Sequence, residues 1–266
     1  MERRTYALRL LYDGARFRGF QRQPGLPTVQ EAVEDALAKV GIRAPLAVAA
    51  RTDAGVHALA QVVSFSARAA LDPEALRQRV NADLPEGLMA LEVWAAPACF
   101  HARNSARSRT YVYLLGVDVP EAVRPYAWAL PDARAFPELA APVIDPAAMR
   151  AALQAAVGEH DFTGFARPGE QRGTVRTLLR AEVITAEWTP LHAVVLEGKG
   201  FLRAMVRNLV GTAATVGVGL APVERVAELI AARGRYRGVR APGWGLTLAA
   251  VAYPPGQLPA PPGTAR

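Results

Sequence analysis

Apolar and polar residues alternate over several short stretches of this chain, and loops rich in glycine and proline separate them. Alternation with a period of two is typical of strands that bury one face. In the first part of the chain it predicts strands at residues 5–12, 45–50, 61–66 and 88–94. Helices are expected at residues 29–40, where the apolar positions follow helical spacing, and from Asp72-Pro73, a common helix opening. The predicted order is therefore β-α-β-β-α-β.

The ends of the first predicted helix carry their own signals. Thr28 and Glu31 have the spacing of a capping box, in which each side chain accepts a hydrogen bond from the other residue's backbone N–H. Gly41 stands where a left-handed residue commonly ends a helix. We therefore expect a helix that begins just after Thr28 and ends just before Gly41.

The same order of elements recurs in the rest of the chain. Strands are predicted at residues 110–116, 178–187, 191–198 and 246–253, and helices from Asp145-Pro146 to Gly158, at 201–216 and at 223–232. The repeat predicts an α+β fold of two ferredoxin-like β-α-β-β-α-β halves, which form an extended, mainly antiparallel sheet with helices on one face and a central basic cleft. The predicted divisions are residues 1–104, residues 105–253, and a flexible proline-rich tail at 254–266.

Composition excludes several classes of protein. The chain has 266 residues, 51% of them hydrophobic, which is too apolar for a disordered protein. No apolar run is long enough for a transmembrane helix, and no secretory leader pattern opens the chain. Cys99 is the single cysteine and the four histidines are isolated, so neither a disulfide nor a metal site is expected. These features favour a cytoplasmic protein.

The net charge of +7 is carried almost wholly by arginine, because Lys39 and Lys199 are the only lysines. The guanidinium group is always charged and has donors that match phosphate oxygens, so the bias suits a polyanionic partner. Compositional drift produces the same bias, and charge alone leaves both explanations open.

A polar string, Arg51-Thr52-Asp53-Ala54-Gly55-Val56-His57, interrupts two apolar strands. A carboxylate beside a guanidinium stays ionised, so Asp53 near Arg51 suits a nucleophile or a general base. A salt-bridged hairpin turn explains the same residues. The local sequence leaves both readings open.

A longer set of motifs decides between them. The strings YDGARFRGFQRQ, RTDAGVHA, FHAR, SRTYVY, DFTGF and MVRNLVG, in this order, closely resemble the TruA family of tRNA pseudouridine synthases. The resemblance implies an isomerase without cofactor or metal that converts uridines 38, 39 and 40 of the tRNA anticodon stem-loop to pseudouridine. It also implies a homodimer.

The resemblance further implies roles for single residues. Asp53 falls on the nucleophile, Tyr111 on a tyrosine that stacks on uracil and assists proton removal at C5, and Arg207 on an arginine that pairs with the nucleophile. Arg51 is expected to help hold the target nucleotide out of its stack. The candidates for RNA contact are Arg22, Gln23, Arg103, Arg107 and Arg109.

Two residues depart from the family pattern. Many members have histidine where this chain has Ala204, and tyrosine where it has Thr247.

An RNA-binding or tRNA-chaperone protein without turnover is the alternative function. A more distant one is a hydrolase that uses Asp53 with His57.

Overall fold

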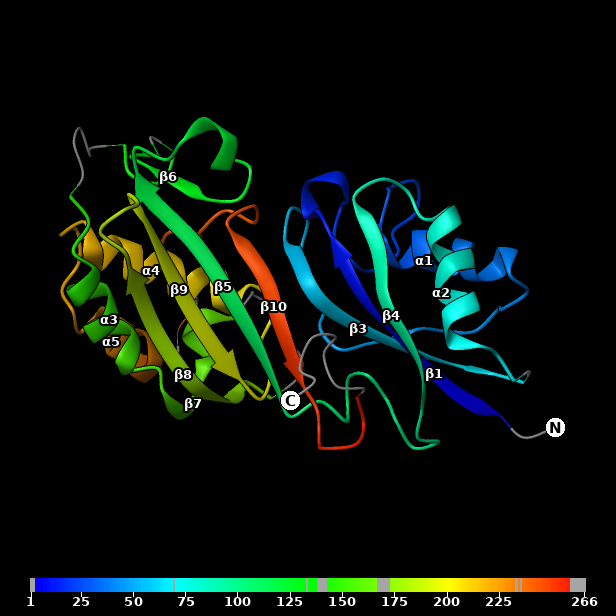
Figure 1. Cartoon of the computed structure of the whole chain (residues 1–266). Helices are drawn as coiled ribbons and strands as arrows, with labels where there is room; N and C mark the ends of the chain where they lie inside the picture. The colour runs from blue at the N-terminus through cyan, green and yellow to red at the C-terminus, as the bar shows by residue number, and fades with distance from the viewer. Residues whose placement is uncertain are drawn as a thin grey trace. The chain divides into compact units, whose positions relative to one another are not determined.

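The computed structural model describes residues 3–68, 70–132, 134–137, 143–166, 173–232, 234 and 236–258. It has a mixed α+β fold with a large, mostly antiparallel sheet (Figure 1). The chain divides into two compact units. Unit 1 comprises Met1–Arg109 and Leu248–Arg266, and unit 2 comprises Thr110–Thr247. Most of the last strand, from Leu248 on, thus belongs to unit 1, whereas the sequence placed the whole strand in the second half.

Unit 1 has the predicted order of elements. These are β1 (Arg4–Tyr12), α1 (Val29–Lys39), β2 (Ala47–Val48), β3 (His57–Ala67), α2 (Pro73–Asp83) and β4 (Leu88–Ala96), with a short 3-10 helix, η1, at Gly14–Arg16. Its strands follow the order β4-β1-β3-β10, and β2 also pairs with β3. β10 spans Leu246–Ala252. The antiparallel pairs of β1 with β3 and β4 make up the centre of this sheet.

Alternation along β1 explains the core of unit 1. Tyr6, Leu8, Leu10 and Tyr12 lie on one face of the strand and are fully buried. Burial of a leucine or valine side chain contributes about 2 kcal/mol to stability. α1 and α2 pack against each other, and α2 packs on β4.

Unit 2 has more elements than the sequence predicted. They are β5 (Ser108–Val117), β6 (Trp128–Leu130), α3 (Pro146–Gln154), β7 (Gly158–Asp161), β8 (Val175–Thr185), β9 (Leu191–Gly198), α4 (Met205–Gly217) and α5 (Arg225–Ala232), with 3-10 helices η2 (Glu121–Val123) and η3 (Phe162–Phe165). The strand order is β5-β9-β8-β7, with β6 parallel to β5. α3, α4 and α5 contact one another, and α3 packs on β8 (Figure 1).

Two helices of unit 2 differ by about a turn from their predicted ranges, and the third, α5, begins two residues later than predicted. The helix expected to end at Gly158 ends at Gln154, and Gly158 instead starts β7 with φ of +109° and pairs with Leu178. The helix expected from residue 201 begins at Met205, because Ala204 has φ of +63°. Left-handed backbone of this kind does not continue a helix.

The capping box expected at the start of α1 is absent. The Thr28 side chain caps no backbone group, and its Oγ1 is buried without a hydrogen-bond partner. The carboxylate of Glu31 instead accepts from the guanidinium of Arg22. The predicted caps at Asp72 and Asp145 are confirmed, because each accepts from the first turn of its helix. Gly41 has the predicted left-handed backbone.

The predicted tail is described only in its first residues. The indole N–H of Trp94 donates to the carbonyl of Gln257 over 3.3 Å, so this part lies on unit 1. Residues 259–266, the rest of the predicted flexible tail, lie outside the described residues. None of the helices described in the chain has the length and apolar character needed to cross a bilayer.

Candidate active site

Asp53 lies in the loop of residues 49–56, which connects β2 to β3 in unit 1 and is called the Asp53 loop below. The Asp53 side chain is half-buried, Thr52 is buried and Arg51 is exposed. The expected pair between Arg51 and Asp53 is not formed, since Arg51 makes no ion pair within the part of the chain that the structure describes. Something other than Arg51 must hold the loop in place.

Hydrogen bonds along its main chain hold the Asp53 loop. The N–H of Ala49 donates to Val62 over 2.9 Å, and the carbonyl of Thr52 accepts from the N–H of Phe20 over 3.0 Å. Ala50 is held at both of its backbone groups by the buried side chain of Gln61, whose Oε1 accepts over 3.3 Å and whose Nε2 donates over 2.6 Å. A loop with this many fixed groups presents its side chains from a rigid base.

Two glycines of the preceding loop pack directly on this main chain. Gly19 has φ of +98°, and a Cβ on it would lie 3.0 Å from the carbonyl oxygen of Thr52. A Cβ on Gly14 would overlap the carbonyl of Val56. Glycine is needed at both positions because the two backbones approach so closely.

A buried tyrosine reaches the side chain next to Asp53. The hydroxyl of Tyr12 lies 2.8 Å from Thr52 Oγ1 and accepts from Gln61 Nε2 over 3.2 Å. Burial raises the pKa of Tyr12 to about 12, although its hydrogen bonds with Thr52 and Gln61 lower it. The phenol therefore keeps its proton at neutral pH.

His57 closes the other end of the loop at the start of β3. It is 5% exposed, and its Nδ1 lies 3.1 Å from both the Gly14 N–H and Asp13 Oδ1. A neutral ring accepts from Gly14 at this nitrogen, whereas a ring protonated there donates to Asp13. The neutral ring thus serves the main chain at Gly14 and the protonated ring the carboxylate of Asp13, and neither of these two contacts involves Asp53.

Arg109 contacts protein carbonyls in a buried position, contrary to the expectation of an exposed phosphate contact. Its side chain is 7% exposed. Nε and Nη2 donate to Ala49 over 3.2 and 2.9 Å, Nη2 donates to Arg103 over 2.7 Å, and Nη1 donates to Ala106 over 3.4 Å. One guanidinium thus ties the start of the Asp53 loop to the loop that carries Arg103.

Arg103 and Arg107 are exposed, as expected for residues that contact RNA, and they stand on an ordered loop. The Nδ1 atom of His101 accepts from the N–H groups of Arg103 and Asn104 over 3.2 and 3.3 Å. The hydroxyl of Tyr253 donates to Ala102 over 2.6 Å. Arg103 therefore projects from a fixed turn, and Arg107 follows it on a segment whose own N–H donates to the carbonyl of Ala252 over 2.8 Å.

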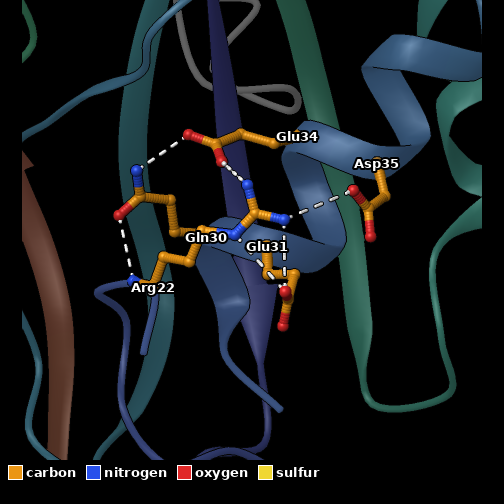
Figure 2. A network of polar contacts seen from close by, with 5 residues as sticks. All are labelled: Arg22, Gln30, Glu31, Glu34 and Asp35. Carbon is orange, nitrogen blue, oxygen red and sulfur yellow. Dashed lines mark hydrogen bonds and ion pairs between the residues drawn. The ribbon is translucent and has the colours of Figure 1, made fainter. Parts of the chain in front are cut away.

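Arg22 is exposed but surrounded by carboxylates of α1, as Figure 2 shows. Its guanidinium lies 3.2 Å from Glu31, 3.5 Å from Glu34 and 3.9 Å from Asp35. The neighbouring Gln23 donates from Nε2 to the carbonyl of Arg18 over 2.9 Å. The charge of Arg22 is thus largely compensated within the protein.

Tyr111 and Arg207 belong to unit 2. Tyr111 lies in β5 and is 7% exposed, with its ring edge-to-face with Phe201 at 5.3 Å. Arg207 lies in α4, where its Nε donates to Ala241 over 2.7 Å. Its charge also lowers the pKa of Tyr113, although burial raises that pKa overall.

The two departures from the family pattern lie at element ends. Ala204 is the left-handed residue directly before α4, and Thr247 is half-buried in β10.

The sequence analysis missed Tyr12 and Gln61. In the sequence, Tyr12 is a residue with a hydroxyl at the end of an apolar strand, and Gln61 is a polar residue in another.

Within the described residues, no group of three His, Cys, Asp or Glu side chains lies so that it could hold a metal ion.

Comparisons with known proteins extend over most of the chain. A family model described as tRNA pseudouridine synthase matches residues 10–103 and 152–254. Proteins named tRNA pseudouridine synthase A from Bordetella petrii and Chloroflexus aurantiacus are 41% and 42% identical to this chain, covering 94% and 96% of it and 91% of each relative. The one from Frankia casuarinae is 42% identical, covering 93% of this chain and 89% of its own.

Among solved structures, a chain of "Structure of H/ACA RNP bound to a substrate RNA containing 2'-deoxyuridine" is 17% identical, with a TM-score of 0.32. The match covers 79% of this chain and 44% of that chain. A likeness at this level is too low to inform the fold.

Proposed function

This chain belongs to the tRNA pseudouridine synthase A (TruA) family, and from that membership we propose that Asp53 is the nucleophile with which it converts uridine to pseudouridine in tRNA. The enzyme is an isomerase. The bond from N1 of uracil to C1′ of ribose breaks, a bond from C5 to C1′ forms, C5 loses a proton and N1 gains one. No atom is added, so the protein must hold both fragments and exclude water between the two steps.

The half-buried carboxylate on a rigid loop is the observation that carries this proposal. Asp53 adds to the base, adds to the sugar or takes a sugar proton, and each of these routes requires an ionised carboxylate in a fixed position. The hydrogen bonds at Ala49, Ala50 and Thr52 supply that position. Arg207 is proposed to pair with the ionised carboxylate.

We propose that Tyr111 stacks on the uracil and assists removal of the proton from C5. Its edge-to-face contact with Phe201 sets the plane of the ring, which supports a stacking role. Arg51 is exposed and is proposed to hold the target nucleotide out of its stack.

The proposed RNA contacts differ in strength. Arg103 is exposed on an ordered turn and Arg107 is exposed on a segment bonded to Ala252, which supports contact with backbone phosphates. Arg22 and Gln23 would contact RNA only after exchanging their present protein partners. Arg109 is proposed to act on this surface indirectly, through the carbonyls of Arg103 and Ala106.

We also propose which uridines of tRNA are modified and how the protein assembles. Uridines 38, 39 and 40 of the anticodon stem-loop are the proposed targets, in a basic cleft formed by two ferredoxin-like halves of a cytoplasmic homodimer. The order β4-β1-β3 with β2 on the far side of β3 in unit 1 supports the ferredoxin-like arrangement of that half.

The test uses unmodified tRNA transcripts that carry uridine at these positions. The wild-type protein is expected to form pseudouridine there, and Asp53→Asn is expected to form none while still binding tRNA. Asp145→Asn, which changes only a helix cap in unit 2, is the matched control and should keep wild-type activity. Activity of Asp53→Asn at the wild-type rate would remove Asp53 as the nucleophile. Binding without turnover by the wild type would favour the RNA-chaperone alternative.

A further inference from the structure

We propose that Tyr12 is a positioning residue for the reaction, and that its hydroxyl acts through Thr52 to fix the main chain from which Asp53 projects. The inference rests on the proposed role of Asp53. Tyr12 is 2% exposed and ends β1, so it contacts the Asp53 loop from inside unit 1. It therefore acts on the site through protein atoms.

Packing alone does not explain a tyrosine at this position. A phenylalanine would bury the same ring without placing a hydroxyl in the core, where an unbonded one is costly. The Tyr12 hydroxyl instead has two partners, Thr52 and Gln61, at 2.8 and 3.2 Å. Because Gln61 Nε2 donates to the phenol oxygen, the phenol proton is available to Thr52 Oγ1.

The two partners of Tyr12 hold the chain on the same side of Asp53. Gln61 binds both backbone groups of Ala50, and Thr52 is bonded at its side chain by Tyr12 and at its carbonyl by Phe20. Threonine is β-branched, so fixing its hydroxyl also restricts its χ1 angle and the backbone that carries it. The residue directly before Asp53 is thus held at two points.

An extra residue in β3 accompanies the approach of Tyr12 to this loop. Pairing between β1 and β3 shifts register between Leu10 and Tyr12, so that Leu10 pairs with Gln61 and Tyr12 with Ala58. Such irregularities re-aim side chains near functional sites. Here the shift occurs at the two residues, Tyr12 and Gln61, that hold the Asp53 loop.

Tyr6 offers a matched control on the same strand. It is 1% exposed and lies on the same face of β1, and its hydroxyl accepts from the N–H of Leu71 over 2.8 Å. Tyr6→Phe and Tyr12→Phe each remove one buried hydroxyl and its hydrogen bonds. Only the second change touches the Asp53 loop.

The experiment measures single-turnover pseudouridine formation with enzyme in excess over unmodified tRNA, together with the Kd for tRNA and the Tm of each variant. Tyr12→Phe and Thr52→Val should each lower the rate constant at saturation by about tenfold, because small displacements of a reacting group are costly. The Kd should stay within about twofold of the wild type, because neither residue is proposed to contact RNA. Thr52→Ser keeps the hydroxyl and should retain most of the rate.

The double variant Tyr12→Phe with Thr52→Val should be no slower than either single variant, since both break one link. Equal rates for Tyr12→Phe and Tyr6→Phe would overturn the inference, as would additive losses in the double variant. If Tyr12→Phe fails to fold, the comparison of Thr52→Val with Thr52→Ser decides the matter alone. Asp53→Asn assayed alongside separates the proposals: an active Asp53→Asn removes the nucleophile, whereas an inactive one with a normal Tyr12→Phe removes only the positioning role.

Discussion

Gly19 lies so close to the Asp53 loop that a methyl group on its Cα would stand 3.0 Å from the carbonyl oxygen of Thr52. Its backbone is also left-handed, with φ of +98°. Gly19→Ala should therefore lower the free energy of unfolding by about 2 kcal/mol or more, through strain and through displacement of the loop. The rate of pseudouridine formation should fall together with the stability, as a denaturant titration and a single-turnover assay would show.

Gly25→Ala is the control for this prediction. Gly25 also has a left-handed backbone, with φ of +70°, but a Cβ there would meet nothing within 4 Å. This variant should lose about 1 kcal/mol of stability from strain alone and keep the wild-type rate. Equal loss of activity in the two variants would contradict the importance of the Gly19 contact.

The salt dependence of tRNA binding should separate the exposed arginines. If Arg103 and Arg107 each contact one phosphate as proposed, Arg103→Gln and Arg107→Gln should each reduce the slope of log affinity against log salt by about one unit. Arg22→Gln should change the slope less, since its guanidinium is already paired with Glu31, Glu34 and Asp35. Filter binding at several salt concentrations measures these slopes. An Arg22→Gln effect as large as that of Arg103→Gln would show that the carboxylates release Arg22 to RNA.

Substitution of the residues that precede α3 and α1, Asp145 and Thr28, should change stability in opposite directions. Asp145 accepts from the N–H groups of Ala147 and Ala148 over 2.8 and 3.0 Å, so Asp145→Ala should lower stability by about 1 kcal/mol. Thr28 makes no such bond and buries its hydroxyl without a partner. Thr28→Val should raise stability by about 1 kcal/mol, since it removes that hydroxyl. Urea denaturation measures both, and destabilisation by Thr28→Val would show that the hydroxyl is bonded in solution.

Alkaline pH should destabilise the protein. Burial raises the pKa of Tyr12 to about 12, whereas its ordinary value, that of an exposed tyrosine, is 10.0. The stability that this group contributes is therefore present in full below pH 10 and is lost as the pH rises toward about 12, because the unfolded chain releases the proton first. The slope for one such tyrosine is about 1.4 kcal/mol per pH unit.

Burial also raises the pKa of Tyr113, Tyr236 and Tyr253, so several groups add to this loss. Urea denaturation between pH 8 and about pH 11 would measure the slope. Tyr12→Phe should follow the wild type below pH 10 and lose stability less steeply above it. Identical slopes above pH 10 would contradict the raised pKa of Tyr12.

Local chemistry predicted those features of the fold that depend on neighbouring residues. Asp72 and Asp145 cap helices and Gly41 ends one, because these signals act within a single turn. The prediction failed at Gly158, which starts β7 through its pairing with Leu178, twenty residues along the chain. The capping box predicted at Thr28 and Glu31 is absent for a similar reason, since Glu31 accepts from Arg22 in the preceding loop.

The motifs predicted the family of the protein and hence its activity, and the structure adds the supports that no motif states. Arg109 stands in a polar stretch that suggests an exposed charge, but its guanidinium is buried against carbonyls from two separate loops. Tyr12 and Gln61 lie on different strands, and only the register between β1 and β3 brings their side chains together. Contacts of this kind depend on distant pairing and are invisible in a local pattern.

The division of unit 1 between the two ends of the chain has a consequence for biosynthesis. Its sheet includes β10, and the residues from Leu248 onward are made after unit 2, which is one continuous segment. A ribosome that has added Thr247 has synthesised all of unit 2 but only the first two residues of β10, the strand that pairs with β3. Domains generally fold as units while synthesis proceeds from the N-terminus. In this protein the unit that carries Asp53 is begun before unit 2 and completed after it, so the nascent chain holds an incomplete Asp53 unit for as long as unit 2 is being made.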